Sequence, residues 1–159
     1  SIREGWQHSM TVPRELSWKG DILCQKPVRE LEALRKDEIV LEHGEAEIHG
    51  GAFDLVAERD IAGEIPVRIC FNQELQITYG HGVVSMEFLN NTGSGRTIRK
   101  ARLDGLQNVR ILMDVSLMEV YFNDGELVMT TRYYPEDPMT TKVSISGMEK
   151  VKGWTMAGQ

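Results

Sequence analysis

The sequence predicts an all-β fold, an antiparallel two-sheet sandwich with one short connector helix. Short segments that alternate apolar with polar residues, or that are rich in β-branched residues, recur along the whole chain. Gly, Asn, Asp and Pro separate these segments at intervals of about 8–12 residues, a spacing typical of sandwiches and barrels. Helical periodicity occurs at one place. No repeat of fixed period and no low-complexity linker divides residues 36–159, which indicates one domain there.

The expected strands follow one another with short turns between them. They are 6–12, 15–19, 22–27, 38–43, 52–58, 67–72, 74–79, 83–89, 97–103 and 109–115, then the two arms of a hairpin within 114–135, and finally 142–147 and 152–157. The connector helix is expected in PVRELEALR (27–35). Pro27 suits a first helical turn, and the apolar residues that follow it recur at helical spacing.

Length and composition narrow the class of protein. A chain of 159 residues can bury a real hydrophobic core without staples. The net charge of −6 disfavours binding to nucleic acid through a basic surface, and no apolar run approaches the roughly 18 residues of a membrane span. Cys24 and Cys70 lie in no disulfide or zinc motif, so no metal or cofactor is expected, and unpaired thiols fit a reducing compartment.

The stretch DVSLMEVYFNDGELVMTTRYYP (114–135) predicts a hairpin, because Asp124-Gly125 favours a two-residue type I′ turn. Pairing outward from this turn sets Phe122 against Leu127 and Met118 against Thr131. One face then carries Met118, Val120, Phe122, Leu127, Met129 and Thr131, and we expect it to face the core. The other carries Glu119, Tyr121, Val128, Thr130 and Arg132, a mixed surface that is either solvated or covered by another domain.

The four carboxylates of this stretch, Asp114, Glu119, Asp124 and Glu126, raise the question of glycosidic catalysis. Five positions separate Asp114 from Glu119, so in a continuous strand they project from opposite faces and cannot flank one bond. Asp124 and Glu126 flank a turn that prefers such residues. All four are therefore interpreted as parts of a solvated face and a turn, and no catalytic residue is assigned.

Three separated motifs, in the order of the family, resemble the C-terminal β-sandwich of glycoside hydrolase family 32, which includes invertases, levanases, inulinases and sucrose-6-phosphate hydrolases. The segment 103–135, from LDGLQN to RYYP, is similar to that sandwich. The segment GWQHSMTVPRELSWKGDILCQKPVRELEALR (5–35), with PREL at 13–16 and QKPVREL at 25–31, resembles the passage from the last blade of the catalytic propeller into the sandwich. The similarity is weakest across 36–102 and is greatest to the bacterial intracellular sucrose-6-phosphate hydrolases.

The resemblance implies that the catalytic motifs belong to a propeller absent from this sequence. The family uses an aspartate nucleophile in an NDP motif, a second aspartate in RDP and a glutamate in EC. Here Gly125 follows Asn123-Asp124, Ile61 follows Arg59-Asp60, and no Glu precedes either cysteine. The chain is therefore expected to be catalytically silent, although the full-length parent is expected to be a β-fructofuranosidase.

Other candidate sites have ordinary structural interpretations. The segment NNTGSGR (90–96) is expected to be a hairpin loop, since strands flank it and a phosphate cradle needs a following helix. The histidines share no spacing and receive no role; they are His8, His43, His49 and His81. The aromatic residues are expected to pack in the core or between domains rather than to form a sugar platform; they are Trp6, Trp18, Tyr121, Tyr133, Tyr134 and Trp154.

Two functions remain open. Either the chain is an accessory sandwich that stabilises the propeller of the same parent and takes part in a homo-oligomer, or it is an independent carbohydrate-binding module. A module should present two or three exposed aromatic rings on one concave face, whereas an accessory domain should show an apolar patch made for a partner. On the first reading residues 1–14 are the arm from the propeller and residues 15–159 the sandwich, in a cytoplasmic enzyme. Ile2, Trp6 and Met10 are then expected to be either poorly ordered or packed against another copy of the chain.

Overall fold

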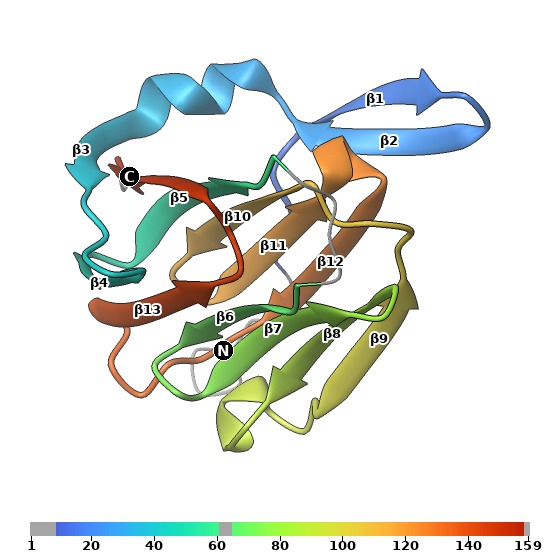
Figure 1. Ribbon diagram of the computed structural model, residues 1–159. Helices are drawn as coiled ribbons and strands as arrows, with labels where there is room; N and C mark the ends of the chain where they lie inside the picture. Colours follow the sequence, from blue (N-terminus) through green and yellow to red (C-terminus); the bar gives the residue numbers. More distant parts are fainter. Residues whose placement is uncertain (1–8, 61–64, 158–159) are drawn as a thin grey trace.

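The computed structural model, which describes residues 9–60 and 65–157, is a two-layer sandwich (Figure 1). Two antiparallel sheets of six strands each form the layers, and a separate two-stranded hairpin lies beside them. The all-β sandwich predicted from the sequence is confirmed. No helix in the described part of the chain has the length and apolar character needed to cross a membrane.

The strand order of each sheet mixes early and late parts of the chain. The first sheet has the order β12-β11-β10-β5-β14-β3 and the second has the order β4-β13-β6-β7-β8-β9. The first sheet consists of β3 (Arg35–Ile39), β5 (Ala52–Glu58), β10 (Asn108–Asp114), β11 (Leu117–Phe122), β12 (Leu127–Arg132) and β14 (Lys150–Met156). The second consists of β4 (Glu45–His49), β6 (Val67–Phe71), β7 (Leu75–Gly80), β8 (Val83–Phe88), β9 (Ile98–Arg102) and β13 (Thr140–Ser146). The hairpin is formed by β1 (Arg14–Lys19) and β2 (Ile22–Pro27).

The core lies between the inner faces of the two sheets. The rings of Phe53 on β5 and Phe71 on β6 stack with their centroids 6.0 Å apart, which joins the two layers directly. The predicted core face of the 114–135 hairpin is confirmed, since Met118, Val120 and Phe122 belong to the apolar core cluster, whereas Tyr121 is buried outside it. Large buried side chains from both sheets fill this space, which is the main source of stability in a domain of this size.

The type of each helix or strand was predicted more accurately than the residues at which it begins and ends. The connector helix is confirmed as a 3-10 helix, η2 (Arg29–Leu34). The strand expected at 38–43 begins at Arg35 and ends at Ile39, while β4 has no counterpart among the predicted strands. The strand expected at 6–12 is wrong for residues 9–12, which are not in a strand, and residues 6–8 lie outside the described residues.

The turn of the 114–135 hairpin keeps the predicted register but has three left-handed residues instead of two. β11 and β12 pair from Met118–Thr131 to Phe122–Leu127, as expected. Asp124 and Gly125 have positive φ, as a type I′ turn requires, and so does Asn123, with φ of 48°. The Asn123 side chain stabilises this conformation, since its Nδ2 donates to Gly105 O at 2.6 Å and its Oδ1 accepts from Gln107 N at 2.8 Å.

Candidate functional site

The structure corrects the interpretation of Asp114 and Glu119. The chain reverses between them, at Val115 with φ of 51°, so that Asp114 ends β10 and Glu119 lies on β11. Because Asp114 pairs with Leu117, and Leu117 is two residues from Glu119, the two carboxylates share one sheet face instead of opposite faces. Asp114 is exposed and Asp124 is exposed at the turn, as expected, but Glu119 is 2% exposed. Its assignment to a solvated face was wrong.

Glu119 anchors the segment that leads into the hairpin. Its Oε1 accepts a hydrogen bond from the backbone N–H of Val12 at 2.8 Å. Its Oε2 accepts from Arg14 Nη2 at 2.6 Å and from the Tyr121 hydroxyl at 2.7 Å. The side chain of Arg14 also donates to Gln25 Oε1 on β2 and to Thr130 Oγ1 on β12. This cluster, Val12–Arg14–Glu119–Tyr121–Thr130, is called the anchor below.

Burial and hydrogen bonding shift the pKa values of two side chains in the anchor. Burial, and then the hydrogen bond to Glu119, raises the pKa of Tyr121 well above its usual value, so the phenol stays protonated and donates. Desolvation lowers the pKa of Arg14, but the hydrogen bond to Glu119 and the neighbouring Tyr121 outweigh it and the net pKa is raised. A buried carboxylate with both oxygens occupied in this way is held for structure and is poorly placed to act as a nucleophile or acid.

The hairpin also rests on the turn between β11 and β12. Gly125 lies against the main chain of Gln25, so closely that an added Cβ would be 2.6 Å from Gln25 C. Lys19 and Lys26 form ion pairs with Glu126 and Asp124, respectively. Asp124 and Glu126 therefore bind the β1–β2 hairpin, whereas from the sequence they were explained only as residues that turns prefer. Together with the anchor, these contacts fix the hairpin to the sandwich at two points.

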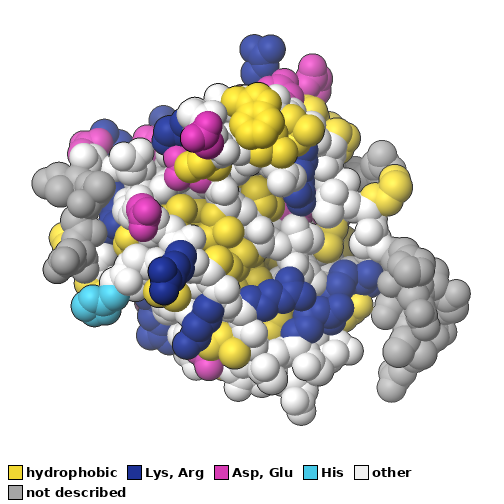
Figure 2. Space-filling model, turned by 90° about the vertical axis from the view of Figure 1, so that its right-hand side faces the viewer, with side chains coloured by type: hydrophobic (Ala, Val, Ile, Leu, Met, Phe, Trp, Pro, Cys, Tyr) yellow, Lys and Arg dark blue, Asp and Glu magenta, His cyan; other side chains and the backbone are white. Residues whose placement is uncertain are grey.

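The outer part of the hairpin carries an exposed apolar face. Trp18 pairs directly with Leu23 across the two strands, and Leu16 lies two residues before Trp18 on the same face. Their exposed fractions are 64% for Leu16, 72% for Trp18 and 42% for Leu23. Figure 2 shows hydrophobic side chains gathered at the top of the molecule, on the side where the hairpin lies. Large apolar side chains grouped in this way on a fixed element are typical of a surface that a partner covers.

A second buried charge cluster lies on the outer face of the first sheet and was missed by the sequence reasoning. Asp54 is fully buried, and both its oxygens accept from Arg110, at 3.1 and 2.8 Å, while its Oδ2 also accepts from Arg35 Nε at 2.8 Å. The Arg35 guanidinium lies 3.9 Å from the centre of the Trp154 ring. Since Arg35 directly follows η2, the cluster holds the connector helix against the sheet. An aspartate in an alternating strand gives no sign of such partners.

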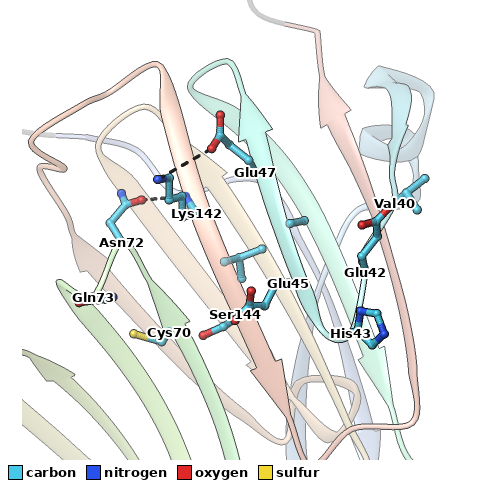
Figure 3. Close-up of a pocket in the computed structure, with 12 residues that line it drawn as sticks. Val40, Glu42, His43, Glu45, Glu47, Cys70, Asn72, Gln73, Lys142 and Ser144 are labelled. Atoms are coloured by element: carbon cyan, nitrogen blue, oxygen red, sulfur yellow. Dashed lines mark hydrogen bonds and ion pairs between the residues drawn. The ribbon is translucent and has the colours of Figure 1, made fainter.

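A polar hollow of about 840 Å³ lies on the second sheet (Figure 3). Its wall on one side is formed by Val40, Glu42 and His43, and its other lining residues come from β4, β6, β13 and the turn after β6. Lys142 and Glu47 form an ion pair within it, at 4.0 Å. No Phe, Tyr or Trp is among the described lining residues, and the described residues include no group of three or more potential metal ligands. The hollow therefore lacks the stacking surface expected of a sugar-binding module.

The remaining predicted sites have structural roles where the structure describes them. The loop 90–96 connects β8 to β9, as expected, and Asn90 Oδ1 accepts from Thr92 N at 3.0 Å. His43, His49 and His81 are exposed, and His8 and Trp6 lie outside the described residues. Tyr133 is fully buried and donates to Glu74 at 2.5 Å, which confirms a packing role for this aromatic residue.

Comparison with known protein families shows to which family this domain belongs. A family model described as glycosyl hydrolases family 32, C terminal, matches residues 30–155. The chain belongs to this family. The match covers both sheets of the sandwich, from η2 to the last residues of β14, and confirms the resemblance found in the sequence.

Curated relatives of this family 32 domain include sucrose-6-phosphate hydrolases from several bacteria. That of Bacillus subtilis (strain 168) is 30% identical over 141 residues, covering 82% of this chain and 29% of the relative. That of Klebsiella pneumoniae is 32% identical over 149 residues, covering 85% of this chain and 28% of the relative. The chain thus spans less than a third of the length of these relatives.

Solved structures of family 32 enzymes share the fold. A glycoside hydrolase family 32 structure from Bifidobacterium adolescentis has a TM-score of 0.79 at 17% identity, covering 93% of this chain and 26% of that chain. A sucrose-6-phosphate hydrolase from Lactobacillus gasseri has a TM-score of 0.64 at 19% identity, covering 91% of this chain and 33% of that chain. The same sandwich therefore forms one part of longer enzymes.

Proposed function

We propose that this domain is the non-catalytic support of a longer parent enzyme that hydrolyses terminal β-fructofuranosides, with sucrose 6-phosphate as the favoured substrate. The observation that carries the proposal is the exposed apolar face of Leu16, Trp18 and Leu23, held rigidly by the anchor and the 123–126 turn. The domain presents this face to the catalytic part of the same parent, which precedes it in the family. The substrate rests on the names of the relatives in Bacillus and Klebsiella.

The carbohydrate-binding alternative lacks support from the surface. Among the described residues, Trp18 is the one aromatic residue in the set of exposed large hydrophobic side chains. Its apolar neighbours on the hairpin, Leu16 and Leu23, are aliphatic. A sugar platform would need a second ring on the same face. The division into an arm at 1–14 and a sandwich at 15–159 belongs to the same proposal, as does a cytoplasmic parent, which the two free buried cysteines, Cys24 and Cys70, support.

The proposal is tested first by catalytic silence. Purified 1–159 should release no fructose from sucrose, sucrose 6-phosphate or inulin, because the chain holds no NDP, RDP or EC motif. Fructose release that followed the chain through purification, and that persisted in a host lacking its own invertase, would refute a purely supporting role.

A second test addresses the hairpin face. Trp18→Asp in the parent should lower its melting temperature and its retained activity after mild heating, because an aspartate cannot replace the apolar contact. The same change in 1–159, measured at a concentration low enough to keep the chain monomeric, should leave the melting temperature unaltered, since Trp18 is already exposed there. Met139→Asp is the matched control, because Met139 is 62% exposed in a loop apart from the hairpin. Equal behaviour of the two variants in the parent would contradict the docking role.

A further inference from the structure

The edge strand β9 carries a run of cations that stands out in this acidic chain. Its sequence is Ile-Arg-Lys-Ala-Arg, and Arg99, Lys100 and Arg102 are all exposed. The net charge of the whole chain is −6. Lys100 and Arg102 project from one face of this strand and Arg99 projects from the other. The three cations therefore surround an exposed sheet edge and make it locally positive, and they are called the β9 row below.

The β9 row also differs from most cations of the hairpin and of the neighbouring clusters in its pairing. Arg14, Lys19 and Lys26 on the hairpin pair with carboxylates, and so do Arg35, Arg110, Lys142 and Lys150 elsewhere. In the described part of the chain, no carboxylate lies within ion-pair distance of Arg99, Lys100 or Arg102. Arg99 instead donates to the backbone oxygen of Thr130 on β12, at 2.6 Å. This contact joins the edges of the two sheets into one continuous surface.

The β9 row lies on the same side of the molecule as the hairpin. Figure 2 shows Lys and Arg side chains crossing the face below the hydrophobic cluster, over the edge of the sandwich where β9 lies in Figure 1. A partner that covers Leu16, Trp18 and Leu23 is therefore on the same side of the molecule as the β9 row. The part of the parent that precedes this domain is long enough to do so, since relatives are more than three times the length matched here.

We propose that the β9 row docks a carboxylate-rich surface on the catalytic part of the parent, beside the apolar contact of the hairpin. This inference rests on the proposed function and adds the chemistry of the partner. Complementary charge would fix the register of the two domains while apolar contact supplies most of the affinity. Charged residues on an edge strand also discourage pairing with other chains, and that role needs no partner surface.

Charge reversal separates these roles. Lys100→Glu with Arg102→Glu in the parent should lower its melting temperature by more than about 2 °C at low salt. The decrease should be smaller at about 0.5 M NaCl, because salt at that concentration screens the attraction between exposed charges. The same pair of changes in 1–159 should leave the melting temperature within error. Lys36→Glu with Lys152→Glu is the matched control, because both lysines are exposed on strands at the opposite side of the first sheet.

Each outcome decides something. An equal shift in the parent and in 1–159, or no salt-dependent shift in the parent, overturns the proposal and leaves an edge-protection role. Stabilisation of 1–159 by millimolar inorganic phosphate that disappears in the charge-reversed variant also overturns it, in favour of a small-anion site. If Trp18→Asp destabilises the parent while the charge reversal does not, the supporting function stands and only the carboxylate partner is lost. If neither change affects the parent, both proposals fail.

Discussion

Gly125 offers the sharpest test of how the hairpin sits on the sandwich. Its φ is +89°, a conformation that costs a residue with a Cβ about 1–3 kcal/mol. In addition, a Cβ at this position would overlap the main chain of Gln25, with Gln25 C at 2.6 Å and Gln25 N at 2.9 Å. Backbone cannot rotate away as a side chain can, so β2 must shift. Overpacking of this kind costs about a further 1–3 kcal/mol.

Gly95 supplies the matched control for this prediction. Its φ is +88°, and nothing lies within 4 Å of an added Cβ. Gly95→Ala should therefore show the conformational cost alone, while Gly125→Ala should show that cost plus the overlap with β2. For a chain of this length each kcal/mol corresponds to about 2–4 °C, so Gly125→Ala should melt about 2–12 °C below Gly95→Ala.

Thermal unfolding of the two variants of 1–159, followed by circular dichroism and calorimetry, measures this difference. Urea unfolding at 25 °C should give the same order of the two free energies of unfolding. Equal destabilisation by both substitutions would refute the close approach of β2 to the turn, and with it the rigid mounting of the hairpin face.

Three further predictions follow from the anchor, the exposed face and the buried phenols. Glu119→Gln should lower the free energy of unfolding by about 3 kcal/mol in urea titrations, because it leaves the largely buried guanidinium of Arg14 without its charge partner. Asp124→Asn, which affects an exposed ion pair, should cost about 0–1 kcal/mol. Equal effects of the two substitutions would contradict the anchor. Purified 1–159 should self-associate with increasing concentration in sedimentation velocity, and Trp18→Asp should suppress this, so a wild-type chain that stays monomeric at high concentration would count against an uncovered face. The pKa values of Tyr121 and Tyr133 are raised in the folded state, so the contribution of these phenols to the free energy of unfolding is complete below the unfolded value of about 10 and is lost as pH rises toward their folded values. Stability should therefore fall above about pH 10, and Tyr133→Phe should make that fall less steep. An unchanged slope in the variant would contradict this reasoning.

The sequence predicts best where the information is local. The pairing of Phe122 with Leu127 follows from Asp124-Gly125 and from alternating side chains, and it is correct even though Asn123 adds a third left-handed residue to the turn. The helical connector follows from the spacing of its apolar residues, although its 3-10 geometry does not, and Pro27 ends β2 instead of occupying the first helical turn. Strand ends, such as that of β3 at Ile39, depend on which neighbour each strand meets and were less accurate.

The candidate site depends on contacts between distant residues, and these were not predicted. Glu119 is buried because Arg14, which is 105 residues earlier, lies over it. Asp54 is buried because Arg35 and Arg110 approach it from two other strands. Alternation assigns both acidic residues to an outer face, which is correct, but it cannot tell a solvated outer face from one that another element covers. The odd spacing of Asp114 and Glu119 failed for a simpler reason, because Val115 turns the chain.

The positions of β13 and β14 within the sheets have a consequence for biosynthesis. β14 fills the place between β5 and β3, and β13 fills the place between β4 and β6, although both are the last strands of the described chain. Until the ribosome has released them, β3 and β4 have no partner strand and one edge each of β5 and β6 is open. Pairings between segments so far apart in the chain form slowly, and open edges invite aggregation. A truncation upstream of Lys150 should therefore yield a nascent chain that depends on chaperones and is cleared by proteases, which makes β14 a checkpoint for the completeness of this domain.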